Sequence, residues 1–159
     1  MNTRKMFAHY ALFCCLLVSS LFIGTDAYGG TYDGESFRET YSHNNAYEFL
    51  KECAKANTSE TWNTWRTIQR YRGHYEIDLK YSDLAGYNLA GFDLSMSDLQ
   101  EAYLTYANLD EANFLGANLY NADLHSSSLK QANLSGAMLN VADLSKADLF
   151  GVNLSRADL

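Results

Sequence analysis

A single five-residue pattern runs without interruption from Ile77 to Leu159 and fills more than half of the 159-residue chain. Its third position is Leu in sixteen copies and Phe in one, at Phe114. The position two residues earlier is small in most copies, usually Ala and otherwise Ser, and the position between is almost always Asp or Asn. Any fold for this segment must therefore bury a large apolar side chain at every fifth residue.

A period of five fits neither of the ordinary regular elements. On an α-helix, five residues advance about 140° around the axis, so the leucines would cover every face instead of one stripe. On a flat strand, an odd period sends successive leucines to opposite faces. All of them point to one axis only if the chain turns by about a quarter revolution per copy, so that four copies close one coil. The small residue points inward as well, because alternate residues of an extended segment share a face.

The phrase A-[D/N]-L-x-x, repeated through residues 77–159, resembles the repeats of the pentapeptide repeat proteins. The resemblance implies a β-solenoid, namely a right-handed quadrilateral parallel β-helix of about four coils. Three copies in the first coil carry a bulky residue at the small inward position, at Ile77, Tyr87 and Phe92. We expect the first coil to be wider or distorted there, where something packs on it.

The first 27 residues have the features of a secretory signal peptide. Arg4 and Lys5 give a positive start, an apolar run follows, and small residues precede residue 28. The alternative is an uncleaved membrane anchor over residues 6–24, which is just long enough to span a bilayer. Residues 28–44 are rich in Gly, Tyr and Ser without periodicity and predict a flexible linker. The protein is therefore expected to be exported, either to a periplasm or out of the cell.

Residues 45–76 predict two short helices that cap the solenoid. Asn45 and Asn57 are each followed three residues later by Glu, which is the capping-box signature of a helix start. Residues 62–66 resemble a leader helix that precedes many pentapeptide repeat domains, and an apolar helix would cover the open end of the first coil. An aromatic ligand-binding box is the alternative interpretation. The apolar edge that would form the cap consists of Trp62, Trp65 and Ile68.

The net negative charge of the chain lies entirely in the repeats. Residues 77–159 hold eleven Asp or Glu and four Lys or Arg, and this difference of −7 equals the formal net charge of the whole chain. Contacts to the phosphates of a nucleic acid need a basic face, so a nucleic acid is not expected as a partner.

The sequence shows no catalytic, cofactor-binding or metal-binding constellation. His43, His74 and His125 fall in the predicted linker, in a connector and at an outward repeat position, and none has metal-ligand spacing to another His or Cys. Cys53 falls on the apolar face of the first helix, which indicates a core residue. The frequent Asp residues are what the repeat itself requires, because Asp and Asn hydrogen-bond to tight turns. We expect a protein without enzymatic activity and without a cofactor.

Two neighbouring faces of the predicted solenoid carry six of the acids. Stacking residues twenty apart puts the column that starts at Asp78 beside the column that starts at Asp83. Tyrosines and a Met are interleaved with these acids, which makes this surface the candidate site for a protein partner. The alternative is a negative surface that serves only solubility. The candidate residues are Asp78, Asp83, Asp98, Tyr103, Tyr106, Tyr120, Asp123, Met138, Asp143 and Asp158.

These observations favour an exported, non-enzymatic scaffold or protein-interaction module, with membrane contact only if the leader is uncleaved. The family resemblance implies one alternative, because some members are DNA-mimicking inhibitors of DNA gyrase. A signal peptide would remove the protein from the cytoplasm, and four coils make a rod of only ~20 Å, so this alternative is disfavoured. An enzyme ranks third. The pattern stops in mid-phrase at Leu159, so we expect either a homodimer through the C-terminal coil or a truncated gene product.

Overall fold

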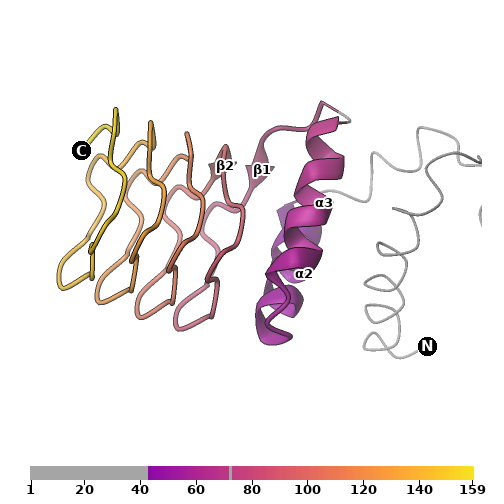
Figure 1. The fold of residues 1–159 in the computed structure, drawn as a ribbon, viewed down its shortest axis with the longest axis horizontal. Helices are drawn as coiled ribbons and strands as arrows, with labels where there is room; N and C mark the ends of the chain where they lie inside the picture. The colour runs from indigo at the N-terminus through magenta and orange to yellow at the C-terminus, as the bar shows by residue number, and fades with distance from the viewer. Residues whose placement is uncertain (1–42, 72) are drawn as a thin grey trace, which may run out of the picture.

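The structure is a computed structural model that describes residues 43–71 and 73–159, so the predicted signal peptide (1–27) and the predicted linker up to residue 42 lie outside the described residues. Two helices come first, α2 (His43–Lys55) and α3 (Ser59–Tyr71). Two short parallel strands follow, β1 (Ile77–Asp78) and β2 (Ser97–Asp98). The helices lie at one end of a row of stacked coils, and the C-terminus lies at the other end (Figure 1). None of the described helices is long and apolar enough to cross a membrane.

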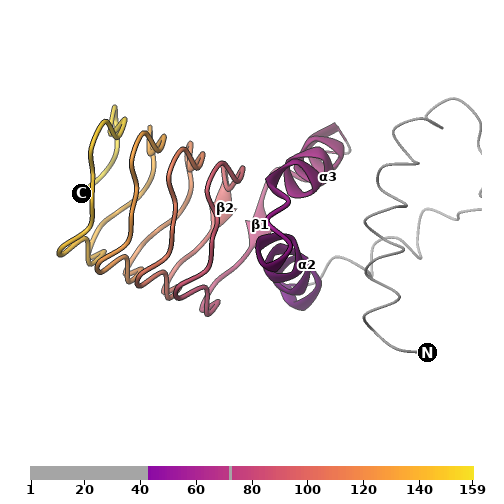
Figure 2. The same cartoon turned by 60° about the horizontal axis from the view of Figure 1, so that its bottom comes forward.

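The repeats wind into coils of twenty residues each. β1 pairs with β2 in the parallel register Asp78↔Asp98, and single-residue bridges continue the same offset as far as Met138↔Asp158. Each coil has four such bridging positions, which define four sides, and successive coils lie side by side along one axis (Figure 2). Every fifth residue therefore points to this axis, as the period of the sequence predicts.

Each side of a coil ends in the same tight turn. The N–H of the residue three positions after the Leu bonds back to the Leu carbonyl, as from Ala112 to Leu109 at 3.1 Å. The residue just before this donor has a positive φ at all sixteen corners, although only five of the sixteen are Gly. This is the geometry of a type II turn, and it is costly for residues with a side chain, most of all for β-branched ones. Val141, with a φ of 64°, is therefore the most strained corner.

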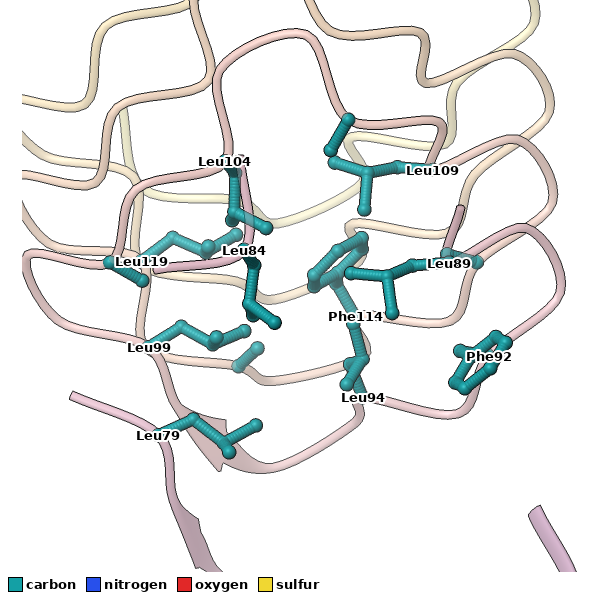
Figure 3. Close-up of a cluster of buried hydrophobic side chains, with 14 of the residues drawn as sticks. Leu79, Leu84, Leu89, Phe92, Leu94, Leu99, Leu104, Leu109, Phe114 and Leu119 are labelled. Carbon is teal, nitrogen blue, oxygen red and sulfur yellow. The ribbon is translucent and has the colours of Figure 1, made fainter. Parts of the chain in front are cut away.

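The core is a stack of apolar side chains along the axis. Leu79, Leu99 and Leu119 form one column, and Phe114 follows Leu94 in another (Figure 3). All five side chains are fully buried, and so are the small inward residues Ser97, Ala112 and Ala117 that accompany Leu99, Phe114 and Leu119. Burying one such large side chain stabilises the fold by about 1.5–3 kcal/mol, so these columns hold the coils together. The narrow axis explains why the second inward position is Ala or Ser.

Burial declines in the last coil. Leu144 and Leu154 are only half-buried, Leu149 is 37 % exposed and Leu159 is 72 % exposed. No described coil lies beyond these side chains to cover them. A homodimer through this coil would bury them, and it stays a prediction.

Both ends of α2 differ from the predicted ones. α2 begins two residues before Asn45, which therefore lies in its first turn. Asn57 has a φ of 53°, and its N–H bonds to Ala54 O at 3.1 Å. The next N–H, of Thr58, bonds to Cys53 O at 2.9 Å, which completes a Schellman motif. The predicted capping box at Asn57 is wrong, because Asn57 ends α2 in the left-handed region while Thr58 directly precedes α3.

The two helices pack on the first coil, where the repeat is bulky. Phe92 and Ile77 are buried in the same cluster as the apolar faces of the helices, and Tyr87 packs against that cluster. On the helix side, three aromatic rings lie with centroids 4.8–5.9 Å apart. These rings belong to Phe49, Trp62 and Trp65. The helical cap is thus what packs on the first coil at its bulky positions.

Candidate interaction surface and helical cap

The side chains of α3 make hydrogen bonds that a preceding coil would otherwise make. Within the solenoid, the backbone of Asn113 donates its N–H to the coil before it at 2.9 Å and accepts an N–H from that coil at 2.8 Å. One coil earlier, Asp93 makes the same two backbone bonds to side chains: it donates to Asn63 Oδ1 at 2.7 Å and accepts from Trp62 Nε1 at 2.8 Å. Asn63 Nδ2 also donates to Gly91 O at 2.9 Å. The backbone edge of the first coil is thus paired by a helix instead of a strand.

Two arginines of α3 extend this pairing. Arg66 is fully buried and donates through Nη2 to the carbonyls of Ser95 and of Tyr75, the latter at 3.1 Å. Arg70 forms an ion pair with Asp93, with Nη1 2.6 Å from Oδ2, and also donates to Ser95 Oγ. Burial raises the pKa of Asp93, but hydrogen bonds from Arg70 and Ser95 outweigh it and hold the pKa below its usual value. Burial and the neighbouring Arg70 lower the pKa of Arg66 to about 10, so the Arg66 guanidinium is still charged at neutral pH.

The three predicted cap residues lie on the helix that contacts the first coil. Trp62 and Trp65 are buried, and Ile68 is half-buried. Sequence reasoning missed the polar residues that pair the backbone edge of this coil. They recur at helical spacing beside the tryptophans, and this polar stripe is the signal by which they could have been found. They are Asn63, Arg66 and Arg70.

Most outward Asp and Asn side chains hydrogen-bond to their own turns. In thirteen copies the side-chain oxygen accepts the backbone N–H two residues later, as Asp143 does from Ser145 at 2.8 Å. Where Ser128 replaces the usual acceptor, Asp110 of the previous coil accepts the N–H of Lys130 at 3.0 Å instead. The acids therefore have the turn-forming role predicted for them. The described residues contain no group of three or more His, Cys, Asp or Glu that could hold a metal ion.

The ten predicted patch residues lie on two adjacent sides of the rod and at their corners, and we call this set the acidic–aromatic surface. The first column consists of Asp78, Asp98, Asn118, Met138 and Asp158, and the second of Asp83, Tyr103, Asp123 and Asp143. Tyr120 lies in the turn between the two sides, and Tyr106 lies in the turn that follows the second side. Stacking residues by twenty thus gives the arrangement that the structure has, while the role of this surface stays a prediction.

The carboxylates of the acidic–aromatic surface differ in their partners. Asp98 forms an ion pair with Lys80, with Nζ 3.0 Å from Oδ2. Three others accept the N–H of their own turn and form no ion pair with another described residue; these are Asp83, Asp123 and Asp143. Hydrogen bonds from Ser145 hold the pKa of Asp143 below its usual value, so this carboxylate is ionised at neutral pH. The second column therefore presents negative charge that no described cation neutralises.

Four tyrosine rings are exposed beside these carboxylates. Tyr103 is 55 % exposed, Tyr106 is 69 % exposed and Tyr120 is 45 % exposed. Sequence reasoning missed the fourth, Tyr81, which is 60 % exposed in the first-coil turn between the two sides. Its outward position in the turn of a repeat could have identified it. Large contiguous apolar patches are uncommon on monomeric proteins and often belong to interaction sites, so these rings keep the acidic–aromatic surface as the candidate site.

One trio of side chains resembles catalytic machinery in composition but not in order. His125 Nδ1 lies 2.7 Å from Ser145 Oγ, and Ser145 also hydrogen-bonds to Asp143. In a nucleophilic triad the His stands between the Ser and the acid, so that it can take the hydroxyl proton. Here Ser145 stands between the other two, and the arrangement does not prepare the hydroxyl for attack.

A four-sided coil with parallel pairing at an offset of twenty residues, stacked behind a helical cap, defines the class of this protein as a β-solenoid. The sequence matches the family described as pentapeptide repeats in eight copies, over residues 77–114, 97–136 and 127–159. The chain belongs to the pentapeptide repeat family, whose members form right-handed quadrilateral β-helices. The predicted fold class is thereby confirmed.

Solved structures of pentapeptide repeat proteins are similar to this chain over its repeats. One from the Arabidopsis thaliana thylakoid lumen is 30 % identical with a TM-score of 0.51, and the match covers 53 % of this chain and 58 % of that one. One from Nostoc Pcc 7120 is 39 % identical with a TM-score of 0.49, over 54 % of this chain and 69 % of that one. QnrB1, a plasmid-mediated fluoroquinolone resistance protein, is 23 % identical with a TM-score of 0.31, and the match covers 52 % of this chain and 47 % of that one. No curated protein matches the chain.

Proposed function

We propose that this protein is an exported, non-enzymatic scaffold that binds a protein partner through the acidic–aromatic surface. The observation that carries the proposal is the exposure of four tyrosines beside carboxylates that form no ion pair with another described residue. Tyrosine is enriched in protein interfaces, where its ring supplies contact area and its hydroxyl a hydrogen bond. A surface that serves only solubility would explain the carboxylates and leave the tyrosines unexplained.

The rigidity of the solenoid supports this role. Tyr103, at the centre of the second column, donates its N–H to Ser82 O at 2.9 Å, and its carbonyl accepts from Leu84 N–H at 2.8 Å. It also pairs with Asp123 in the next coil. A partner would therefore meet a preorganised surface and would have little backbone to immobilise on binding.

Site-specific photo-cross-linking tests the surface. A cross-linking residue at Tyr103 is expected to capture a protein partner in cells, whereas the same residue at Asn113, on the opposite side of the same coil, is expected to capture none. Equal capture at both positions would contradict the proposal, because it would show contact without preference for a face.

Export rests on the composition of residues 1–27, and the location of the similar Arabidopsis thaliana protein in the thylakoid lumen supports it. Fractionation of cells that express a tagged chain, with sequencing of the mature N-terminus, tests it. We expect an exported chain that begins near Tyr28. A cytoplasmic chain that retains Met1 would contradict export and make inhibition of DNA gyrase the next assay.

A further inference from the structure

We propose that the partner contacts the acidic–aromatic surface with a segment of protein rich in Lys or Arg, which places its cations on the tyrosine rings and between the flanking carboxylates. This inference rests on the proposed interaction function and adds the chemistry of the partner to it.

The tyrosines carry the inference, because a group of acids alone does not identify a ligand. A cation is attracted to the face of an aromatic ring within about 6 Å of its centre. The described chain contains such a contact on its cap, where Lys51 Nζ lies 4.1 Å from the centre of the Tyr47 ring. The exposed rings of Tyr81, Tyr103 and Tyr120 have no such contact with a described cation, so their faces are available to a cation from outside.

The order of residues in the second column suits a cationic side chain. Within this column, Tyr103 pairs with Asp83 of the previous coil and with Asp123 of the next coil, and Asp143 follows one coil later. Neighbouring coils lie ~4.8 Å apart, so a guanidinium or ammonium group over the Tyr103 ring lies close to two carboxylates. Neither carboxylate forms an ion pair with another described residue, so the incoming charge displaces no cation of the described chain.

The opposite side of the rod lacks this chemistry. The amides of Asn113, Asn133 and Asn153 bond to one another, at 3.0 Å and 3.1 Å along the column. On the side between, Asp148 forms an ion pair with Lys130 at 3.3 Å. Polar groups that already satisfy one another offer an incoming cation little, so the second column and its corners are the preferred contact.

Selection from a random peptide library on the full-length protein tests the proposal, followed by titration of the synthesised binders. We expect the selected peptides to be enriched in Lys and Arg and to bind more weakly as salt rises above about 0.15 M. Tyr103→Ala is expected to weaken binding about fivefold through the lost ring contact. Asp123→Asn is expected to weaken binding and to reduce its salt dependence.

Two matched variants separate the surface from general effects. Tyr71→Ala removes an exposed tyrosine that belongs to α3 and is not a residue of the acidic–aromatic surface. Asp148→Asn removes an exposed carboxylate that caps its own turn as Asp143 does, on a different side of the rod. Both variants are expected to leave peptide binding unchanged, and circular dichroism checks that every variant keeps the fold.

The possible results separate this inference from the function on which it rests. Selection of basic peptides whose binding is weakened by Tyr103→Ala but not by Tyr71→Ala would support both the partner chemistry and the interaction function. Peptides that depend on Tyr103 without an excess of Lys or Arg would overturn the partner chemistry and leave the interaction function standing. Peptides that bind Tyr103→Ala as well as the unchanged protein, or an absence of any selected peptide, would overturn both.

Discussion

Replacing Asn63 by Ala tests whether α3 substitutes for a coil. The side chain donates from Nδ2 to Gly91 O at 2.9 Å and accepts from Asp93 N–H at 2.7 Å. Both bonds are part-buried, and Ala would leave both backbone groups without these partners. A typical hydrogen bond contributes about 1 kcal/mol net, and a buried polar group left unsatisfied costs about 1–3 kcal/mol. We therefore expect the free energy of unfolding to fall by about 2–3 kcal/mol.

Urea unfolding with two probes measures this change. Circular dichroism follows the whole chain, and tryptophan fluorescence follows the cap, which holds both Trp residues of the sequence. Two probes are needed because repeat proteins can unfold in stages. Thr67→Ala is the matched control, since the exposed Thr67 hydroxyl bonds within its own helix, to Asn63 O at 3.0 Å. This control is expected to change stability by less than about 0.5 kcal/mol.

The reasoning would be refuted if Asn63→Ala and Thr67→Ala had the same small effect. The polar side chains of α3 would then contribute nothing to the edge of the first coil. The cap would act only through the apolar cover supplied by Trp62 and Trp65.

Three further predictions test the turns, the ion pair of the cap and the core. Val141→Gly is expected to raise the free energy of unfolding by about 1 kcal/mol, because it relieves the strained φ. Gly136→Val, at a corner with open space, is expected to lower the free energy of unfolding by a similar amount. Thermal melting measures both changes, and two shifts of the same sign would refute this prediction. The folded-state pKa of Asp93 lies below its unfolded value, so its contribution to stability is present above about pH 4 and is lost as the pH falls through the folded pKa. Urea midpoints at neutral pH and at about pH 3 measure this loss, and Asp93→Asn should remove part of the difference. Leu109→Ala, at a fully buried position, is expected to lower the free energy of unfolding measured in urea by about 3–5 kcal/mol. Leu149→Ala, at a partly exposed position, is expected to lower it by less than half as much. The opposite order would contradict the packing described.

The sequence predicts the solenoid and its faces well because each copy repeats the same local arrangement. A turn every fifth residue and an inward Leu leave one way to bury the apolar set, and counting by twenty then assigns every outward residue to a side. The neighbourhood of Asp83, Tyr103 and Asp123 follows from this count without any knowledge of the structure. Tyr81 is missing from the predicted patch, although the same count places it in the turn between the two sides.

The cap could not be predicted to the same depth because its contacts do not repeat. Asn63 meets Asp93 across thirty residues. Asp93 has counterparts in later coils, but Asn63 has no counterpart in the repeats that would reveal the pairing. Asn57 fits the signature of a helix start and also tolerates the left-handed conformation of a helix end. The structure selects the second, since the N–H groups of Asn57 and Thr58 satisfy the last carbonyls of α2.

The offset of twenty residues relates sequence separation both to position along the rod axis and to orientation around it. An insertion of twenty residues would lengthen it by one coil, about 4.8 Å, and leave every side in line. An insertion of five residues after Leu109 would instead move every later residue to the next side of the rod. Asp123 would then no longer pair with Tyr103, although each copy would keep its own fold. Distance along this protein is thus counted in coils and direction in quarter turns, so the number of residues between two side chains decides whether one partner can touch both.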